Sequence, residues 1–183
     1  MMSLSEAARM AKGRTSGGDP AFGGVSTDTR TLKSGDLFVA LRGERYDGHA
    51  FLAQAKAAGA CAAMVDSAHR GEYPMPVVVV DDTRLALGAL AQGWRARFSP
   101  ALVAVAGSNG KTTVKEMLAS ILLSHAGEER VLFTKGNLNN DIGVPLTILT
   151  LGKEHRYCAI ELGMNHKGEI GYLAAIARPT VAR

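Results

Sequence analysis

The sequence contains 183 residues, of which 46% are hydrophobic, and its mean hydropathy is +0.04. These values are ordinary for a folded soluble protein and suffice for one medium-sized domain or two small ones. The 21 basic and 17 acidic residues give a formal net charge of +4. Because no basic run is longer than two residues, the charge pattern excludes an ordinary nucleic-acid-binding surface.

The two cysteines, Cys61 and Cys158, lie inside apolar runs, which is typical of buried reduced thiols and argues against a disulfide framework or a zinc site. The first residues lack the apolar core of a signal peptide, and no run approaches the roughly 18 apolar residues of a membrane span. We therefore expect a cytoplasmic protein that is not inserted in a membrane, and separately we expect it to be a monomer.

The first half of the chain has the pattern of a small α/β unit. Turn residues and apolar periodicity predict a helix over 3–12, a glycine-rich loop over 13–24 and a strand over 36–41. They then predict a helix over 51–58, strands over 61–65 and 77–80, and a helix over 82–98. Ser3 and Glu6 have the spacing of a capping box. The two later strands are short, unalternating apolar runs, as expected for strands buried on both faces.

Pro100 interrupts the last helical pattern and marks the start of a second unit. Here the sequence predicts a strand over 101–106, a long helix after a glycine loop, a strand over 130–134, a helix or turn over 145–151, a strand over 157–162, a helix over 168–177, and a further strand near 181. The long helix has an apolar face formed by Val114, Met117, Leu118, Ile121 and Leu122. Alternating strands and helices predict a parallel sheet.

We place the domain boundary so that the first domain covers residues 1–98 and the second 99–183. The second unit is then about 85 residues long, which is thin for an α/β domain of this kind, because the buried fraction of a domain grows with its size. We therefore expect the sequence to be a fragment of a longer protein.

The loop after the strand over 101–106 carries the strongest functional signal. It reads Gly107-Ser108-Asn109-Gly110-Lys111-Thr112-Thr113 and opens the long amphipathic helix, which is the context of a phosphate-binding loop. Its glycines let backbone N–H groups face an anion, the helix adds its positive end, Lys111 supplies a charge for the phosphates, and Thr112 supplies a hydroxyl for Mg²⁺. Val105 stands where the general motif has another glycine, so this is the shorter G-x-x-G-K-T form.

Glu161 ends the apolar strand over 157–162, where a parallel sheet gathers its ligands. It is a candidate Mg²⁺ ligand because Mg²⁺ prefers oxygen ligands together with phosphates, although an ordinary glutamate at a strand end fits the spacing equally well. Asn165 and His166 follow closely, and the histidine fits either a phosphate contact or a surface loop.

Two further polar clusters are candidates for substrate binding. Asn137, Asn139 and Asn140 offer donors and acceptors suited to sugar hydroxyls or phosphates, but asparagine is also a common turn former. The stretch that contains Thr27, Asp28 and Arg30 follows a glycine pair and could hold a polar ring or a phosphate, or simply cap a turn.

Taken together, these stretches resemble a Mur ligase, and within that family the branch that adds D-alanyl-D-alanine in peptidoglycan synthesis. The matching segments cover 25–30, 35–49, 107–113, 136–145 and 161–170, in family order. The phosphate loop is shared with folylpolyglutamate ligases, whereas 136–141 and 161–166 point to this branch. The resemblance implies a small amino-terminal α/β domain that binds UDP, followed by a truncated ATP-binding domain with a parallel sheet.

The resemblance also implies roles for individual residues. Lys111 and Glu161 become catalytic, and Thr112 and Glu161 become Mg²⁺ ligands beside ATP. The remaining candidates would bind a UDP-N-acetylmuramoyl tripeptide, the uridine end at Thr27, Asp28 and Arg30, and the sugar or phosphates at Asn137, Asn139, Asn140, Asn165 and His166. The implied reaction is ATP-dependent amide formation with D-alanyl-D-alanine in cell-wall synthesis, and we expect the chain alone to be inactive.

Two other classes of protein remain open from the residues. The phosphate loop by itself fits a kinase or another NTPase, although neither the asparagine-rich loop nor a separate amino-terminal unit serves a simple phosphotransferase. The alternative without catalysis is a module that binds a UDP-sugar or a nucleotide.

Overall fold

The computed structural model describes residues 1–43, 46–164 and 166–182. Contacts between residues divide the chain into two compact units, Met1–Leu90 and Ala91–Arg183. The division falls inside helix α3 (Thr83–Arg95), ahead of the boundary that Pro100 led us to place at 98/99. It does so because the last turn of α3 bonds to the second unit: Trp94 Nε1 donates to the Leu151 carbonyl at 2.9 Å, and Arg95 Nε donates to the Ala177 carbonyl at 2.8 Å.

The first unit is built on a five-stranded sheet in the order β2-β7-β6-β5-β4. Four neighbouring strands are parallel: β4 (Val25–Ser26), β5 (Leu37–Val39), β6 (Ala62–Asp66) and β7 (Val77–Val80). Strand β2 (Arg14–Ser16) pairs antiparallel with β7 at the edge. The remaining elements are β1 (Met2–Ser3), α1 (Leu4–Ala11), β3 (Ala21–Phe22), the 3₁₀ turn η1 (Gly48–Phe51) and α2 (Leu52–Ala57).

The caps and the core of this unit follow from its sequence. Ser3 Oγ accepts the Glu6 N–H at the start of α1, as the capping box predicts. Asp82 Oδ1 accepts the Arg84 and Leu85 N–H groups and so caps α3. The parallel strands are almost entirely buried, so their apolar runs form the core with α2.

The segment over 13–24, predicted as a loop, contains β2 and β3. All three residues of β2 are exposed, so the strand has no apolar alternation that a sequence could reveal. Its conformation comes from backbone pairing with β7, where Arg14 lies opposite Val79. This edge strand is therefore a tertiary effect on a polar sequence.

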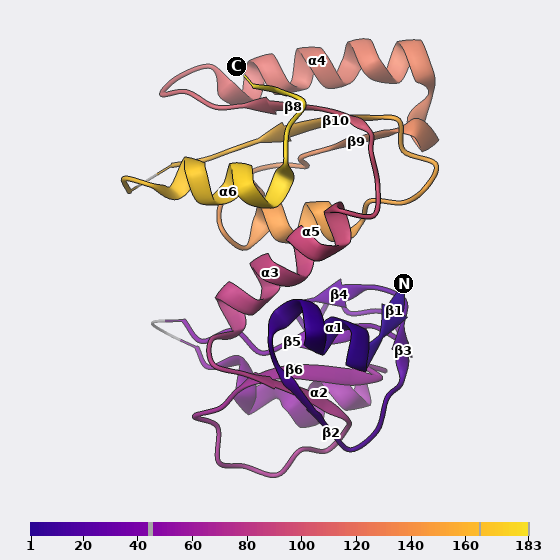
Figure 1. The fold of residues 1–183 in the computed structure, drawn as a ribbon, viewed down its shortest axis with the longest axis vertical. Coiled ribbons are helices and arrows are strands. Elements are labelled where there is room, and N and C mark those ends of the chain that lie inside the picture. Colours follow the sequence, from indigo (N-terminus) through magenta and orange to yellow (C-terminus); the bar gives the residue numbers. More distant parts are fainter. Residues whose placement is uncertain (44–45, 165, 183) are drawn as a thin grey trace. The chain divides into compact units, whose positions relative to one another are not determined.

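The second unit contains an all-parallel sheet in the order β11-β8-β10-β9, as predicted. Its strands are β8 (Ala101–Val105), β9 (Val131–Phe133), β10 (Tyr157–Glu161) and β11 (Val181–Ala182). Figure 1 shows α4 (Lys111–Ala126) on one face of this sheet, with α5 (Gly143–Leu149) and α6 (Glu169–Ala177) on the other. A 3₁₀ turn, η2 (Glu128–Arg130), leads into β9.

The predicted apolar face of α4 is mostly exposed, and only its Leu118 and Leu122 are half-buried. Val114, Met117 and Ile121 are 50%, 62% and 64% exposed, whereas Lys115 and Ala119 are the buried residues. At the start of the helix, the Thr112 hydroxyl is directed at Glu161 at the end of β10. Lys115 and Ala119 lie three and seven positions after Thr112, on the same helix face, and they are therefore the residues turned to the sheet.

Among the described residues, no helix is long and apolar enough to cross a membrane.

Candidate phosphate-binding site

The loop between β8 and α4 has the backbone that the glycine spacing predicts. Gly107 has φ +140° and Gly110 has φ +73°, both in the region that favours glycine. A Cβ atom placed on either residue would meet no atom within 4 Å, so open space adjoins the loop. Gly110 precedes α4, and its carbonyl accepts the Val114 N–H at 2.9 Å. The first amides of α4 have no acceptor within the helix and are available to an anion.

Lys111 and Thr112 project from the first turn of α4. The Lys111 ammonium folds back over the loop and donates to the Ser108 carbonyl at 3.3 Å. The Thr112 hydroxyl donates to Glu161 Oε1, also at 3.3 Å. Both contacts are long for hydrogen bonds of these kinds, so each group can exchange its partner for a phosphate or a cation at low cost.

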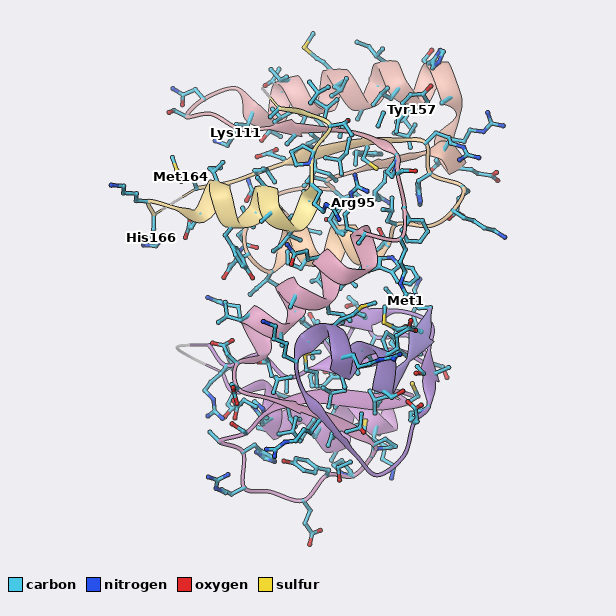
Figure 2. All side chains as sticks on the ribbon, viewed as in Figure 1. Met1, Arg95, Lys111, Tyr157, Met164 and His166 are labelled. Atoms are coloured by element: carbon cyan, nitrogen blue, oxygen red, sulfur yellow. The ribbon has the colours of Figure 1, made fainter. Side chains whose placement is uncertain are left out.

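Glu161 ends β10, which lies between β8 and β9, so its carboxylate reaches the edge of the sheet where β8 enters the phosphate loop. The residue is only 2% exposed. Its N–H donates to Thr134 Oγ1 at 2.9 Å, and its Oε1 accepts the Asn139 side-chain N–H at 2.8 Å. Figure 2 shows Lys111 and Met164 at this end of the sheet, opposite Tyr157 at the start of β10.

The second oxygen of Glu161 is the unusual feature of the site. Oε2 is buried and has no hydrogen-bond partner among the described residues. A buried carboxylate oxygen without a partner is costly, so Oε2 is a position for a cation or a water molecule. Mg²⁺ fits, because it prefers carboxylate and hydroxyl oxygens together with phosphate oxygens, and Glu161 and Thr112 supply the first two.

The described residues contain no group of three or more His, Cys, Asp or Glu that could hold a metal ion without further ligands. A cation at Glu161 would therefore depend on phosphate oxygens and water, which is the usual situation for Mg²⁺ at a nucleotide.

The predicted asparagines occupy three different environments. Asn139 is half-buried and bonds to Glu161, as above. Asn140 Oδ1 accepts the Ile142 and Gly143 N–H groups at 3.2 and 2.8 Å, so it caps the start of α5. Asn137 is exposed. The structure thus brings Asn139 to Glu161 and leaves Asn137 open to solvent.

His166 is exposed and is held by Glu169, whose carboxylate accepts the His166 N–H at 3.0 Å and lies 2.9 Å from Nδ1. It therefore sits at the start of α6 on the loop that follows Glu161. Asn165, predicted to bind substrate, lies outside the described residues.

Sequence reasoning missed Lys115. Its side chain is completely buried beneath α4 and its ammonium pairs with the carboxylate of Glu116, which is 55% exposed. The only signal in the sequence was its spacing of three residues from Thr112, which places both side chains on one face of the helix.

In the first unit, the predicted substrate residues follow β4. Ser26 Oγ accepts the Asp28 N–H at 3.2 Å and donates to the Asp28 carbonyl at 2.9 Å, which closes the turn. The Arg30 guanidinium binds the Asp28 carboxylate through Nε and Nη2, and this contact lowers the pKa of Asp28 from 3.8 to about 2. The Arg30 side chain remains 84% exposed, so it has donors to spare for an anionic ligand.

A second polar cluster, which the sequence did not reveal, lies at the same carboxyl edge of the parallel strands. His49 Nδ1 lies 2.5 Å from Asp47 Oδ1, and His49 Nε2 accepts the Asp66 N–H at 3.0 Å. Arg42 bridges the two carboxylates, with Nη1 2.7 Å from Asp47 and Nη2 2.9 Å from Asp66. In the sequence, Asp47-Gly48-His49 has only the pattern of a turn and a helix start. Their partner Asp66 lies at the end of a buried strand and carried no signal of its own.

Residues 22–95 match the catalytic domain of the Mur ligase family, and residues 105–183 match the Mur ligase middle domain. The chain belongs to the Mur ligase family. The match to the middle domain includes the phosphate loop and Glu161, and the other match includes Thr27, Asp28 and Arg30.

Two curated relatives of this Mur ligase chain carry the same name. It is 48% identical over 181 residues to the UDP-N-acetylmuramoyl-tripeptide–D-alanyl-D-alanine ligase of Escherichia coli, a match that covers 99% of this chain and 39% of the relative. It is 51% identical over 159 residues to the Haemophilus influenzae ligase of the same name, covering 86% of this chain and 35% of the relative. The chain thus spans less than half the length of these relatives.

Solved structures agree with this assignment. A crystal structure of MurF from Acinetobacter baumannii superposes with a TM-score of 0.88 at 42% identity, over 99% of this chain and 40% of that one. The MurF ligase of Thermotoga maritima in complex with ADP gives a TM-score of 0.74 at 33% identity, over 85% of this chain and 35% of that one.

Proposed function

We propose that this chain carries the nucleotide-binding site and the uridine-binding site of an ATP-dependent ligase that joins D-alanyl-D-alanine to a UDP-N-acetylmuramoyl tripeptide. The names of the relatives support the reaction, and the complex of the Thermotoga maritima ligase with ADP supports the nucleotide. Because ATP is a substrate, we also propose a cytoplasmic location.

The observation that carries the proposal is the buried, unpartnered Oε2 of Glu161 beside a complete phosphate loop. Loop amides and Lys111 favour a polyphosphate, and a carboxylate in the same place would repel it. The phosphate loop and the Glu161 carboxylate are compatible when a cation lies between the carboxylate and the phosphates, as it does in Mg²⁺-nucleotide sites.

In the proposed reaction, an oxygen of the tripeptide carboxylate attacks the γ-phosphorus of ATP, and the bond to the β–γ bridging oxygen breaks to release ADP. The resulting acyl phosphate is attacked by the amine of D-alanyl-D-alanine, which forms the amide, releases phosphate and loses one proton. Lys111 neutralises charge on the transferring phosphoryl group and the loop amides orient it. Bound Mg²⁺, held by Thr112 and Glu161, would add further charge neutralisation.

We further propose that Thr27, Asp28 and Arg30 bind the uridine end of the UDP-linked substrate. The Ser26–Asp28 turn orders this segment, and the exposed Arg30 guanidinium presents donors next to an acceptor carboxylate. Asn137, Asn140, Asn165 and His166 remain our candidates for the sugar and phosphates.

Titration calorimetry of ADP in the presence of Mg²⁺ tests the nucleotide site in the chain as it stands. Lys111→Ala should weaken binding by at least roughly tenfold, because hydrogen bonds to charged groups contribute about 1.5–3 kcal/mol and about 1.4 kcal/mol corresponds to tenfold in affinity. Lys153→Ala removes an exposed lysine from a turn of the same unit and should leave affinity unchanged. Equal affinities for the two variants would overturn the assignment.

A second titration separates the ligase from the other classes of protein. UDP-N-acetylmuramoyl tripeptide should bind wild type and should bind Arg30→Ala more weakly, whereas Arg9→Ala, a matched exposed arginine on α1, should behave as wild type. Nucleotide binding without any binding of the UDP-linked peptide would favour a simple NTPase. Binding of the UDP-linked peptide without nucleotide would favour a binding module.

A further inference from the structure

We propose that Asn139 is a positioning residue that orients the Glu161 carboxylate, so that Oε2 is the oxygen presented to the metal ion of the bound nucleotide. This inference rests on the nucleotide site proposed above and assigns a role to a side chain that does not itself touch nucleotide or metal. It comes from an asymmetry in the carboxylate, of which one oxygen is bonded twice and the other not at all.

The two oxygens of Glu161 have opposite surroundings. Oε1 accepts the Asn139 Nδ2–H at 2.8 Å and the Thr112 hydroxyl at 3.3 Å. Oε2 is buried without a hydrogen-bond partner in the described part of the chain. The backbone of Glu161 is fixed separately, since its N–H donates to Thr134 Oγ1. Within the described residues, Asn139 and Thr112 are therefore the side chains whose hydrogen bonds hold the carboxylate in its rotational position.

Asn139 is itself firmly placed. Its N–H donates to the Asn137 carbonyl at 2.8 Å, and its own carbonyl accepts the Gly163 N–H at 2.7 Å. A Cβ atom on Gly163 would lie 2.8 Å from Asn139 Oδ1 and 3.1 Å from the Asn139 carbonyl oxygen, so glycine at 163 is what allows the asparagine to pack there. The Gly163–Asn139 backbone hydrogen bond therefore joins the loop after β9 to the residues after β10.

An amide suits this role because of its charge. Asn139 donates a hydrogen bond without neutralising the carboxylate, so the full negative charge of Glu161 stays available to a cation. Its short bond also differs from the longer Thr112 bond on the same oxygen. When the threonine hydroxyl turns toward a cation, the amide bond can persist and keep Oε2 in place.

Without the amide, Glu161 could rotate and offer either oxygen to the Thr112 hydroxyl. Partners of metal ligands orient those ligands in this way, and their loss typically lowers metal affinity by roughly 10–100-fold. A purely structural asparagine would behave differently. Replacing its side chain leaves the Gly163–Asn139 backbone bond intact, so any effect on the metal can be separated from an effect on the loop.

The test measures ADP affinity by calorimetry twice, with Mg²⁺ and with EDTA, for wild type, Asn139→Ala and the similarly shaped Asn139→Leu. We expect the increase in affinity that Mg²⁺ confers to fall by roughly tenfold or more in both variants, since they lose a partner of a metal ligand. Affinity in EDTA should stay within about twofold of wild type, because the phosphate loop is untouched. Gln54→Ala, which removes an exposed amide from α2, should match wild type in both titrations.

Each other outcome contradicts the inference in a recognisable way. An unchanged Mg²⁺ effect in a folded variant would show that Asn139 does not orient the carboxylate. A parallel loss in Mg²⁺ and in EDTA, with a lowered melting temperature, would assign it a structural role only. Wild type that binds ADP without any Mg²⁺ effect would instead refute the proposed Mg²⁺ position at Glu161, and the inference with it, whereas wild type that does not bind ADP at all would refute the proposed nucleotide site.

A measurement on the unmodified protein covers the case in which both variants fail to fold. The side-chain amide protons of Asn139 should be protected from exchange with water in ¹H–¹⁵N spectra, and should remain protected after Mg²⁺ and ADP are added. Exchange at the rate of exposed amides in the complex would mean that the bond to Glu161 does not persist, and would overturn the inference.

Discussion

Arg95 allows a prediction whose size can be worked out from its contacts. The residue is 5% exposed, and its guanidinium donates to three carbonyl groups: Ala177 at 2.8 Å, Phe98 at 2.6 Å and Arg178 at 3.1 Å. Burial lowers the pKa of Arg95, but an arginine stays charged in practice. Ala177 and Arg178 lie at the carboxyl end of α6, where the helix dipole favours a cation, and Phe98 lies in the segment after α3.

Arg95→Met keeps the length of the side chain and removes all three donors. At about 1.5 kcal/mol for each bond, the lower end of the range for a charged donor, the loss is about 4.5 kcal/mol, and burial of the methionine returns about 1 kcal/mol. We therefore expect the free energy of unfolding of the second unit to fall by about 3.5 kcal/mol. The three hydrogen bonds of Arg95 then contribute a substantial part of the free energy of unfolding of such a small unit.

Urea unfolding followed by tryptophan fluorescence measures this change, because Trp94 is the only tryptophan and its indole N–H bonds to the Leu151 carbonyl in the same unit. Arg97→Met is the matched control. Its guanidinium lies 5.0 Å from the Trp94 ring, a contact of about 0.5–1 kcal/mol at an exposed position. If Arg95→Met were no less stable than Arg97→Met, the carbonyl contacts would contribute nothing and the reasoning would fail.

Three further predictions concern individual groups. The pKa of Asp28, about 2 beside Arg30, should return toward 3.8 in Arg30→Ala, and a carboxyl ¹³C titration can follow this change. Because the pKa of Asp28 is lower in the folded protein than in the unfolded chain, the stabilising contact is complete above about pH 4 and is lost as the pH falls toward 2. Thr134→Val should leave the buried Glu161 N–H without an acceptor and lower the free energy of unfolding by about 1–3 kcal/mol, with an unchanged melting curve as the contrary result. Burial raises the pKa of the Cys158 thiol to about 12, so it should resist alkylation at pH 8 in the native protein, and rapid labelling detected by mass spectrometry would contradict this.

The parts of the fold that could be predicted are those where local sequence and tertiary structure agree. The strand that ends at Val105, the glycine loop and the helix that begins at Lys111 were all expected from the sequence and are all present. Gly107 and Gly110 were placed by a conformation that other residues rarely adopt. A motif of this kind contains its own structural requirement, and for that reason it can be recognised without knowledge of the rest of the chain.

The rotation of α4 could not be predicted, because periodicity reveals an apolar stripe but not the surface that meets it. The stripe containing Met117 and Ile121 was assigned to the core, yet Lys115 is the side chain that faces the sheet. The buried face also carries Thr112, whose hydroxyl bonds to Glu161, a residue far away in the sequence. Which face of the helix is buried therefore depends on tertiary contacts that a helical period does not reveal.

The three asparagines after β9 show why residue type alone did not resolve the site. All were predicted to face the substrate because their side chains offer the same donors and acceptors. Asn140 caps α5 and Asn139 bonds to Glu161, whereas Asn137 is exposed. These differences depend on which neighbour the loop meets, and that neighbour comes from another strand.

The charges around the phosphate loop explain why neutral groups hold the carboxylate. Lys111 is the cation of the loop that can reach phosphates, and it bonds only weakly to the Ser108 carbonyl, so its charge is free for a ligand. Lys115, the second cation of the same helix, pairs with Glu116 instead of Glu161. If either ammonium bonded to Glu161, the carboxylate would lose much of its attraction for a divalent cation. The described hydrogen bonds to the Glu161 side chain instead come from the neutral donors Asn139 and Thr112, an arrangement that suits the proposed site, in which a cation and a polyphosphate bind together.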